Sequence, residues 1–257
     1  MYMLAGPALI LQNRYIMKEL NFAYPATLSS LGQVSSAAIA WLLVHGTGTV
    51  KLEHRDSITP RFYATRVLPV GFLGALTYFF GQKVYLYLDV GLIQMLKAFT
   101  PVTVLVLSIA AGVTRPTAAL KAATVTISIG VVVASVAAIG RGGGDGSTGV
   151  GLLVCLGAEV SEASRLVLTQ MLLVGGLGSK FGVLEGLYWI CPAVICSMWL
   201  LVIPAMELGS MLEHGALAVV AAHPANFATV MALGFLVNFA GLAVIRSTSA
   251  AEWTMCT

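Results

Sequence analysis

Long apolar stretches alternate with short polar segments along the whole chain. Seven of them reach about 18 residues or more, the length at which a helix begins to span the roughly 30 Å hydrocarbon core of a membrane. The pattern predicts transmembrane helices near residues 26–46, 67–88, 90–113, 122–139, 149–174, 184–205 and 225–245, after a shorter one at 4–17.

The opening segment MYMLAGPALILQ has two readings. Its apolar run is long enough for the core of a signal peptide, but it has no basic leading region. No small-residue cleavage site precedes Asn13 and Arg14 either. We therefore interpret the segment as a first transmembrane helix.

Composition supports a membrane location. Hydrophobic residues make up 58% of the chain and charged residues 10%, with a mean hydropathy of +0.90, whereas soluble domains carry about 25% charged residues. The longest polar connections, near 47–66 and 206–224, are too short for a soluble domain. We expect residues 1–257 to form one all-α polytopic helix bundle in the lipid bilayer, with about eight transmembrane helices.

The basic residues of the loops are unequally divided between the two membrane faces if the chain crosses eight times. Loops with more lysine and arginine tend to be cytosolic, so both termini are predicted to be cytosolic. The richer face carries Lys51, Arg55, Arg61, Arg66, Arg115, Lys121, Lys180 and Arg246, and the poorer face carries Arg14, Lys18 and Arg141.

Three basic residues, Lys83, Lys97 and Arg165, lie inside predicted spans. An ionisable group in hydrocarbon costs at least about 2.5–3.5 kcal/mol on insertion scales, so it normally faces the bundle interior or a wet cavity. Lys83 is close enough to the end of its span for the amine to reach the interface. Lys97 and Arg165 are therefore the more informative positions.

Lys97 lies in the run DVGLIQMLKAFTPV, with Gln94 three residues earlier on the same helix face. Pro101 has no amide hydrogen to donate to the Lys97 carbonyl, so we expect a helix break there. Transporters use interrupted helices to expose polar backbone to a solute cavity. The alternatives for Lys97 are an amine that snorkels to the interface or one that pairs with a helix acid.

A second polar cluster lies in EVSEASRLVLTQ, where Glu159, Glu162 and Arg165 follow one another at three-residue steps. Side chains at this spacing lie close together on a helix. We favour a structural Glu162–Arg165 ion pair over direct contact between Arg165 and a solute, and either acid is also available to Lys97. Asn238, deep in the last predicted helix, is a further polar candidate for the solute site.

Enzymatic and metal chemistry find no support. The four histidines show no metal-ligand spacing, and no serine, histidine and acid set falls in one wettable region. The four cysteines form no CxxC pair. We expect no catalytic residue, metal, cofactor or nucleic-acid partner.

Four segments, LYLDVGLIQMLKAFTPVTVLVLS, TRPT, SEASRLVLTQMLL and VIRSTSA, together resemble the triose-phosphate and nucleotide-sugar translocator family of the drug/metabolite transporter superfamily. The resemblance spans nearly the whole chain and is most specific in LIQMLKAFTP and SEASRLVLTQ. It implies ten helices in two inverted five-helix repeats, exchanging a sugar phosphate or nucleotide sugar for phosphate or nucleoside monophosphate. Lys97 matches the family's lysine in the fourth helix.

The chain departs from the family pattern in two places. Plastid phosphate exchangers carry a histidine where this chain has Gln94, so the chain looks more like the less characterised plant and algal branch. Family members also continue beyond the motif resembling RSTSA into two more helices, the ninth carrying an anion-binding lysine and arginine. The sequence stops after AEWTMCT, which implies helices 1–5 at about 1–139 and an incomplete second repeat at about 149–247.

Two functional hypotheses follow. The first is an antiporter of small anionic solutes in an endomembrane, Golgi or ER rather than plastid envelope, because no Arg-rich and Ser-rich transit segment is visible. The second is a truncated, non-transporting relative or a regulatory or dimerisation partner, in which exposed helix faces would drive association into a homodimer.

Overall fold

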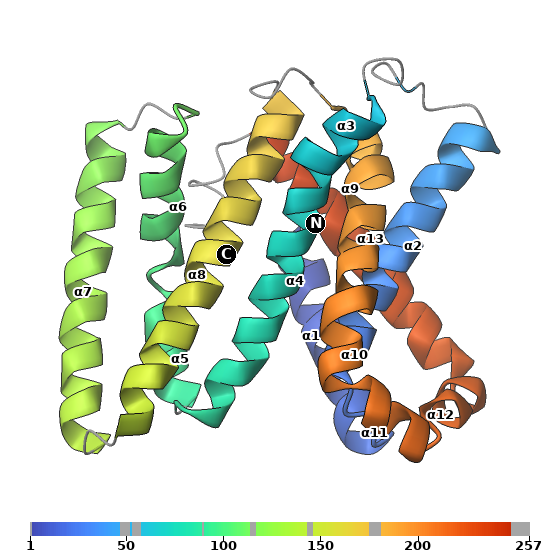
Figure 1. Ribbon diagram of the computed structural model, residues 1–257, viewed down its shortest axis with the longest axis horizontal. Helices are drawn as coiled ribbons and strands as arrows, with labels where there is room; N and C mark the ends of the chain where they lie inside the picture. Colours follow the sequence, from blue (N-terminus) through green and yellow to red (C-terminus); the bar gives the residue numbers. More distant parts are fainter. Residues whose placement is uncertain are drawn as a thin grey trace. The chain divides into compact units, whose positions relative to one another are not determined.

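The computed structural model describes residues 2–46, 52, 58–88, 90–113, 117–142, 146–174 and 181–247. These residues are almost entirely helical and contain no strand, which confirms the predicted all-α class. The elements are α1 (Tyr2–Glu19), α2 (Pro25–His45), α3 (Pro60–Phe62), the π-helix η2 (Tyr63–Val67), α4 (Leu68–Lys83), the 3₁₀-helix η3 (Val84–Leu86), α5 (Val90–Lys97), α6 (Thr100–Ala110), α7 (Ala118–Gly142), α8 (Gly146–Val174), α9 (Val183–Ser197), the π-helix η4 (Met198–Val202), α10 (Ile203–Met206), α11 (Leu208–Glu213), α12 (Ala216–Ala222) and α13 (Pro224–Ser247) (Figure 1).

Within the described residues, five helical stretches are long and apolar enough to cross a membrane: Pro25–His45, Pro60–Leu86, Gly91–Ala110, Val183–Met206 and Pro224–Arg246. They coincide with five of the eight predicted spans and confirm the polytopic membrane class. The other three predicted spans are also helical, as α1, α7 and α8, and the total of eight crossings stays a prediction.

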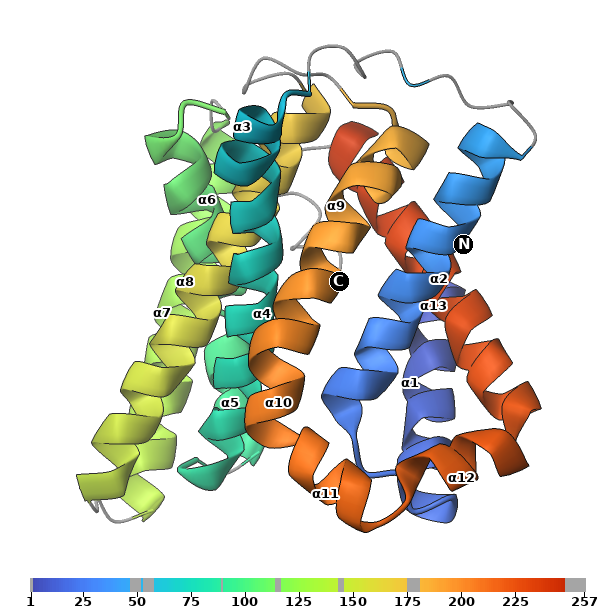
Figure 2. The same ribbon diagram turned by 45° about the vertical axis from the view of Figure 1, so that its right-hand side comes forward.

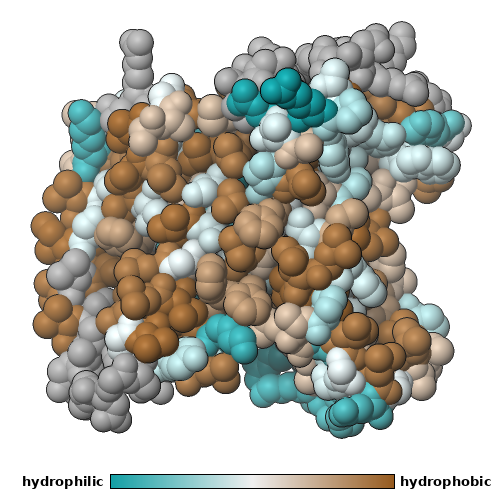
Figure 3. Space-filling view, in the orientation of Figure 1, coloured by the Kyte–Doolittle hydropathy of each residue, from teal (hydrophilic) through white to brown (hydrophobic). Residues whose placement is uncertain are grey.

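Large apolar side chains cover much of the outer surface of the helices. Leu153 on α8 is 71% exposed and Leu200 in η4 is 75% exposed. Figure 3 shows hydrophobic side chains over most of the visible surface, with the strongly hydrophilic ones gathered toward the helix ends. Such a surface matches hydrocarbon along the helices and polar surroundings at their ends.

The chain divides into two compact units. Unit 1 comprises Met1–Ala75 and Leu172–Ser247, and unit 2 contains Leu76–Met171. One boundary falls within α4, whose first half belongs to unit 1 and whose second half belongs to unit 2, and the other falls near the end of α8, between Met171 and Leu172. The predicted repeats at about 1–139 and 149–247 stay a prediction.

In unit 1 the backbones of α2 and α13 approach very closely. A Cβ atom added to Gly234 would lie only 2.5 Å from the Cα atom of Gly32, so this crossing requires glycine. The amide group of Asn238 donates to the Gly32 carbonyl (3.2 Å) and to Ser36 Oγ (2.9 Å), and it accepts from Gln33 Nε2 (3.2 Å). Close backbone contact and polar side chains therefore hold the two helices together.

The segment between α10 and α13 in unit 1 is more ordered than the polar connection predicted at 206–224. It forms the short helices α11 and α12, which join the end of α10 to the start of α13 (Figure 2). The Glu207 carboxylate, between α10 and α11, accepts from Ala26 N (2.7 Å), Thr27 N (2.8 Å) and Thr27 Oγ1 (2.6 Å). Glu207 thus caps the start of α2, where the N-cap residue Tyr24 makes no side-chain cap bond.

In unit 2 a small apolar core packs α5 and the preceding turn against α8. It contains Val84, Leu88, Ile93 and Cys155. A Cβ atom at Gly151 would lie 2.7 Å from the Leu88 side chain, so glycine lets α8 approach this turn closely. The packing brings the end of α5 beside the middle of α8.

Candidate functional site

The helix predicted over 90–113 is interrupted at the position of Lys97. Helix α5 ends at Lys97 and α6 begins at Thr100, and the two residues between them form a turn (Figure 1). Pro101, in the first turn of α6, has no N–H to donate to the Lys97 carbonyl. The Thr100 hydroxyl takes its place, at 2.6 Å from that oxygen.

The Lys97 side chain is exposed at this break. Its Nζ atom lies 5.8 Å from the centre of the Tyr85 ring, within reach of a cation–π interaction. Among the described residues no carboxylate forms an ion pair with the amine, and Asp89 lies outside those residues. Gln94, one turn earlier on α5, is also exposed. The break therefore presents a cation and an amide on α5.

Glu159 on α8 is part of the same junction. Its side chain is 7% exposed, and Oε2 lies 2.5 Å from Thr100 Oγ1. Thr100 consequently contacts both the last carbonyl of α5 and a buried acid of α8. The sequence placed Glu159 in a polar cluster but gave no sign of its contact with Thr100, because 59 residues separate the two.

The Glu162–Arg165 ion pair favoured from the sequence is formed. Arg165 Nε lies 2.9 Å from one carboxylate oxygen of Glu162, and Nη2 lies 2.5 Å from the other. Both side chains are partly exposed, at 30% for Arg165 and 25% for Glu162. Because this bidentate geometry neutralises the guanidinium, direct binding of a solute by Arg165 stays a prediction that requires the pair to open.

Asn238 lies in unit 1, at the crossing of α2 and α13 described above. Both ends of its amide are engaged with α2 residues. Its predicted contact with a solute would have to replace these helix-to-helix hydrogen bonds. The geometry favours a role in packing.

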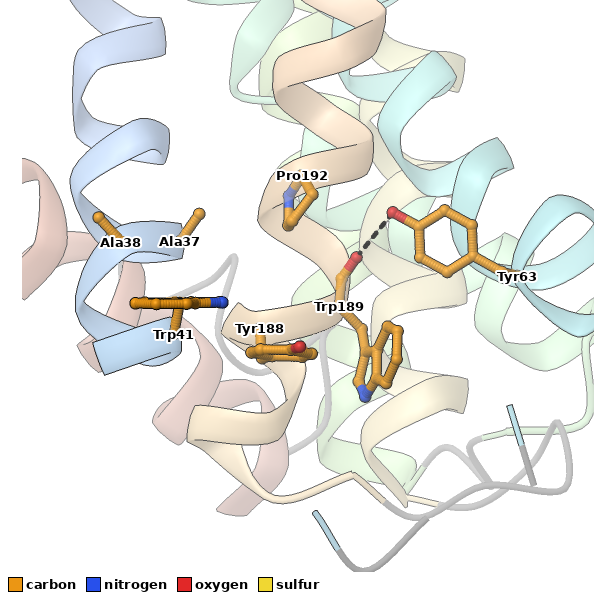
Figure 4. Close-up of a pocket in the computed structure, with 7 residues that line it drawn as sticks. All are labelled: Ala37, Ala38, Trp41, Tyr63, Tyr188, Trp189 and Pro192. Atoms are coloured by element: carbon orange, nitrogen blue, oxygen red, sulfur yellow. Dashed lines mark hydrogen bonds between the residues drawn. The ribbon is translucent and has the colours of Figure 1, made fainter. Parts of the chain in front are cut away.

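Unit 1 contains a cavity of about 420 Å³ between α2, η2 and α9, which the sequence did not reveal (Figure 4). The Tyr63 hydroxyl donates to the Trp189 carbonyl at 3.2 Å, which joins η2 to α9 beside the cavity. Aromatic side chains from all three elements contribute to its lining. The lining residues are Ala37, Ala38, Trp41, Tyr63, Tyr188, Trp189 and Pro192.

Metal binding has no structural basis in the described part of the chain. No group of three or more histidine, cysteine, aspartate or glutamate side chains there could hold a metal ion. The chemistry available at the break is that of an ammonium group, an amide, a hydroxyl and a buried carboxyl group.

The fold and these polar groups define the class of the protein as a polytopic helical membrane protein. No family model matches the chain. Two relatives from Arabidopsis thaliana, each described as a "probable sugar phosphate/phosphate translocator", are 32% identical over 206 residues. The alignments cover 79% of this chain and 57% and 58% of the relatives. The "UDP-galactose transporter 1" of the same plant is 25% identical over 252 residues, covering 96% of this chain and 70% of the relative.

These matches confirm the resemblance to the triose-phosphate and nucleotide-sugar translocator family. The relatives are translocators and transporters rather than enzymes, in agreement with the prediction that the chain is not an enzyme. The chain spans a little over half the length of the sugar phosphate/phosphate translocators that it matches.

Proposed function

We propose that this protein exchanges a sugar phosphate or a nucleotide sugar for phosphate or a nucleoside monophosphate across a membrane. The observation that carries the proposal is the exposed Lys97 amine at the break between α5 and α6, which no described carboxylate neutralises. The relatives described as sugar phosphate/phosphate translocators and as a UDP-galactose transporter support the same class of solute.

The geometry at the break suits an anion. The Tyr85 ring attracts the Lys97 ammonium group through its π-face and brings no formal negative charge of its own. The break also contains the positive end of the α6 dipole, which favours a phosphate group nearby. The Gln94 amide can add a hydrogen bond from the same helix.

The test is exchange of inorganic phosphate by the purified chain in phosphate-loaded liposomes, comparing Lys97→Ala with Lys83→Ala. Lys83 is a matched control because its Nζ atom also lies over an aromatic ring, 5.9 Å from the centre of Phe79. We expect Lys97→Ala to slow exchange by about tenfold to a hundredfold, since a hydrogen bond to a charged group is worth about 1.5–3 kcal/mol. Lys83→Ala should retain the exchange rate of the unaltered protein. Equal exchange rates in the two variants would contradict the proposal.

A second candidate function is that of a non-transporting relative, a regulatory subunit or a homodimerisation partner. The observation behind it is the apolar surface of the helices, with Leu153 on α8 and Leu200 in η4 strongly exposed. Absence of exchange by this chain, together with exchange by a longer version carrying two added helices, would support it. Crosslinking in native membranes tests the homodimer.

The proposed location is an endomembrane, Golgi or ER, with both termini in the cytosol. The excess of basic residues in the loops on one side supports this orientation. Protease protection of tags at each terminus in sealed vesicles tests it, and a tag inside the vesicles would contradict it.

A further inference from the structure

Thr100 Oγ1 lies between two oxygen atoms at the helix break. It is 2.6 Å from the Lys97 carbonyl oxygen and 2.5 Å from Glu159 Oε2, both hydrogen-bonding distances. A threonine hydroxyl has one hydrogen to donate, and a carbonyl oxygen has none. Both contacts can be full hydrogen bonds, rather than one hydrogen shared weakly between two acceptors, only if the second hydrogen belongs to the Glu159 carboxyl group.

An ionised Glu159 leaves one of these contacts unmade. If Thr100 donates to the carboxylate, the Lys97 carbonyl loses its donor, and Pro101 cannot supply another. If Thr100 donates to the carbonyl, the buried carboxylate faces an oxygen lone pair. The first arrangement leaves the exposed Lys97 carbonyl without a protein donor, and the second leaves the buried carboxylate without any donor among the described residues. The two distances from Thr100 Oγ1 therefore fit a protonated Glu159 better than an ionised one.

The surroundings of Glu159 compensate a negative charge only in part, because Lys97 and Thr100 favour the carboxylate whereas burial and Glu162 oppose it. The charged and titratable groups around it are Lys97 on α5 and Cys155 and Glu162 on its own helix. Glu162 is occupied by Arg165, and the Lys97 amine lies over the Tyr85 ring. No ion pair within the described residues includes Glu159, and its side chain is 7% exposed.

We propose that Glu159 is a proton-binding site whose proton fixes the geometry of the α5–α6 break. The protonated carboxyl group donates to Thr100 Oγ1, and the Thr100 hydroxyl donates to the Lys97 carbonyl. When the proton leaves to solvent, the carboxylate takes the Thr100 hydrogen, the Lys97 carbonyl is released, and the Lys97 amine gains a nearby counter-ion.

This site links proton occupancy to anion binding at Lys97, a link that rests on the proposed function. A negative Glu159 competes with the solute for the Lys97 amine, so deprotonation weakens anion binding. The KM for phosphate should therefore rise with pH. In Glu159→Gln the side-chain amide donates to Thr100 at every pH, so its KM should stay near the low-pH value.

Infrared difference spectroscopy on the purified protein tests the proton site without any transport. We expect a protonated-carboxyl C=O band in the unaltered protein near neutral pH, lost in Glu159→Gln and kept in the control Glu162→Gln. Thermal melting checks that both variants are folded. A band that persists in Glu159→Gln, or one that is absent from the unaltered protein, overturns the proposal.

Phosphate exchange in liposomes tests the link to transport. A KM that rises with pH in the unaltered protein and stays flat in Glu159→Gln supports it, whereas identical pH profiles overturn it. If the unaltered chain exchanges no phosphate, the phosphate-exchanging form of the proposed function is contradicted, and the infrared bands alone then decide the proton site.

Discussion

Two buried acids, one in each unit, differ in their hydrogen-bond partners. Glu207 in unit 1 is 6% exposed and Glu159 in unit 2 is 7% exposed. Three donors, the backbone N–H groups of Ala26 and Thr27 and the Thr27 hydroxyl, converge on the Glu207 carboxylate. Glu159 contacts only Thr100 among the described hydrogen bonds, and that hydroxyl also serves the Lys97 carbonyl.

The comparison shows that burial alone does not identify a functional acid. A carboxylate surrounded by donors at a helix N-terminus is stable as an anion, because the N–H groups and the helix dipole both favour negative charge. A carboxyl group that shares a single hydroxyl with another acceptor gains a second hydrogen bond when it carries its own proton. We infer that Glu207 stabilises the fold of unit 1, whereas Glu159 can bind and release a proton.

The largest stability effect is expected for Glu207→Ala. The variant leaves the first N–H groups of α2 without an acceptor in a buried position, so we expect a loss of about 2–3 kcal/mol. The measurement is thermal unfolding in detergent, followed by tryptophan fluorescence. Glu213→Ala, an exposed acid at the end of α11, is the control and should melt like the unaltered protein. Equal melting temperatures for the two variants would contradict a structural role for Glu207.

Much of the fold could be predicted from the sequence. The apolar stretches located the five helices of the described residues that are long and apolar enough to span a membrane. They could do so because backbone N–H and C=O groups in lipid must form their hydrogen bonds within helices. Polar contacts across α2, such as those with Glu207 and Asn238, could not be found, since no local pattern encodes which distant side chain meets a helix.

The candidate site was predicted only in its local part. Pro101 indicated an interruption after Lys97, because the missing amide hydrogen is a property of neighbouring residues. Thr100 and Glu159 were not paired in advance, since their contact depends on how closely α8 packs at Gly151. Aromatic residues near the ends of separate spans were the one signal of the cavity lined by Trp41 and Tyr63.

Intermediate losses of stability are expected when the threonine that contacts each acid is replaced by valine. Thr100→Val removes the hydroxyl that serves both Glu159 and the Lys97 carbonyl, so we expect a loss of about 2 kcal/mol. Thr27→Val removes one of three donors to Glu207 and should cost about 1 kcal/mol. Valine keeps the β-branched shape at both sites, so the two melting curves report the lost hydroxyls. A larger loss in Thr27→Val than in Thr100→Val would show that Thr100 does not bridge Glu159 and the Lys97 carbonyl.

The smallest effect is expected for Asn238→Ala, which asks whether this residue packs helices or binds solute. The Gly32 carbonyl keeps two further donors, Ser35 Oγ at 2.9 Å and Ser36 Oγ at 2.7 Å. The loss should therefore be about 1 kcal/mol, with the KM for phosphate unchanged. Thr229→Ala on the same helix is the control, because its hydroxyl donates to the Ala225 carbonyl of its own helix. A KM raised severalfold in Asn238→Ala without a change in melting would instead make Asn238 a binding residue, and unit 1 would then contribute to the solute site.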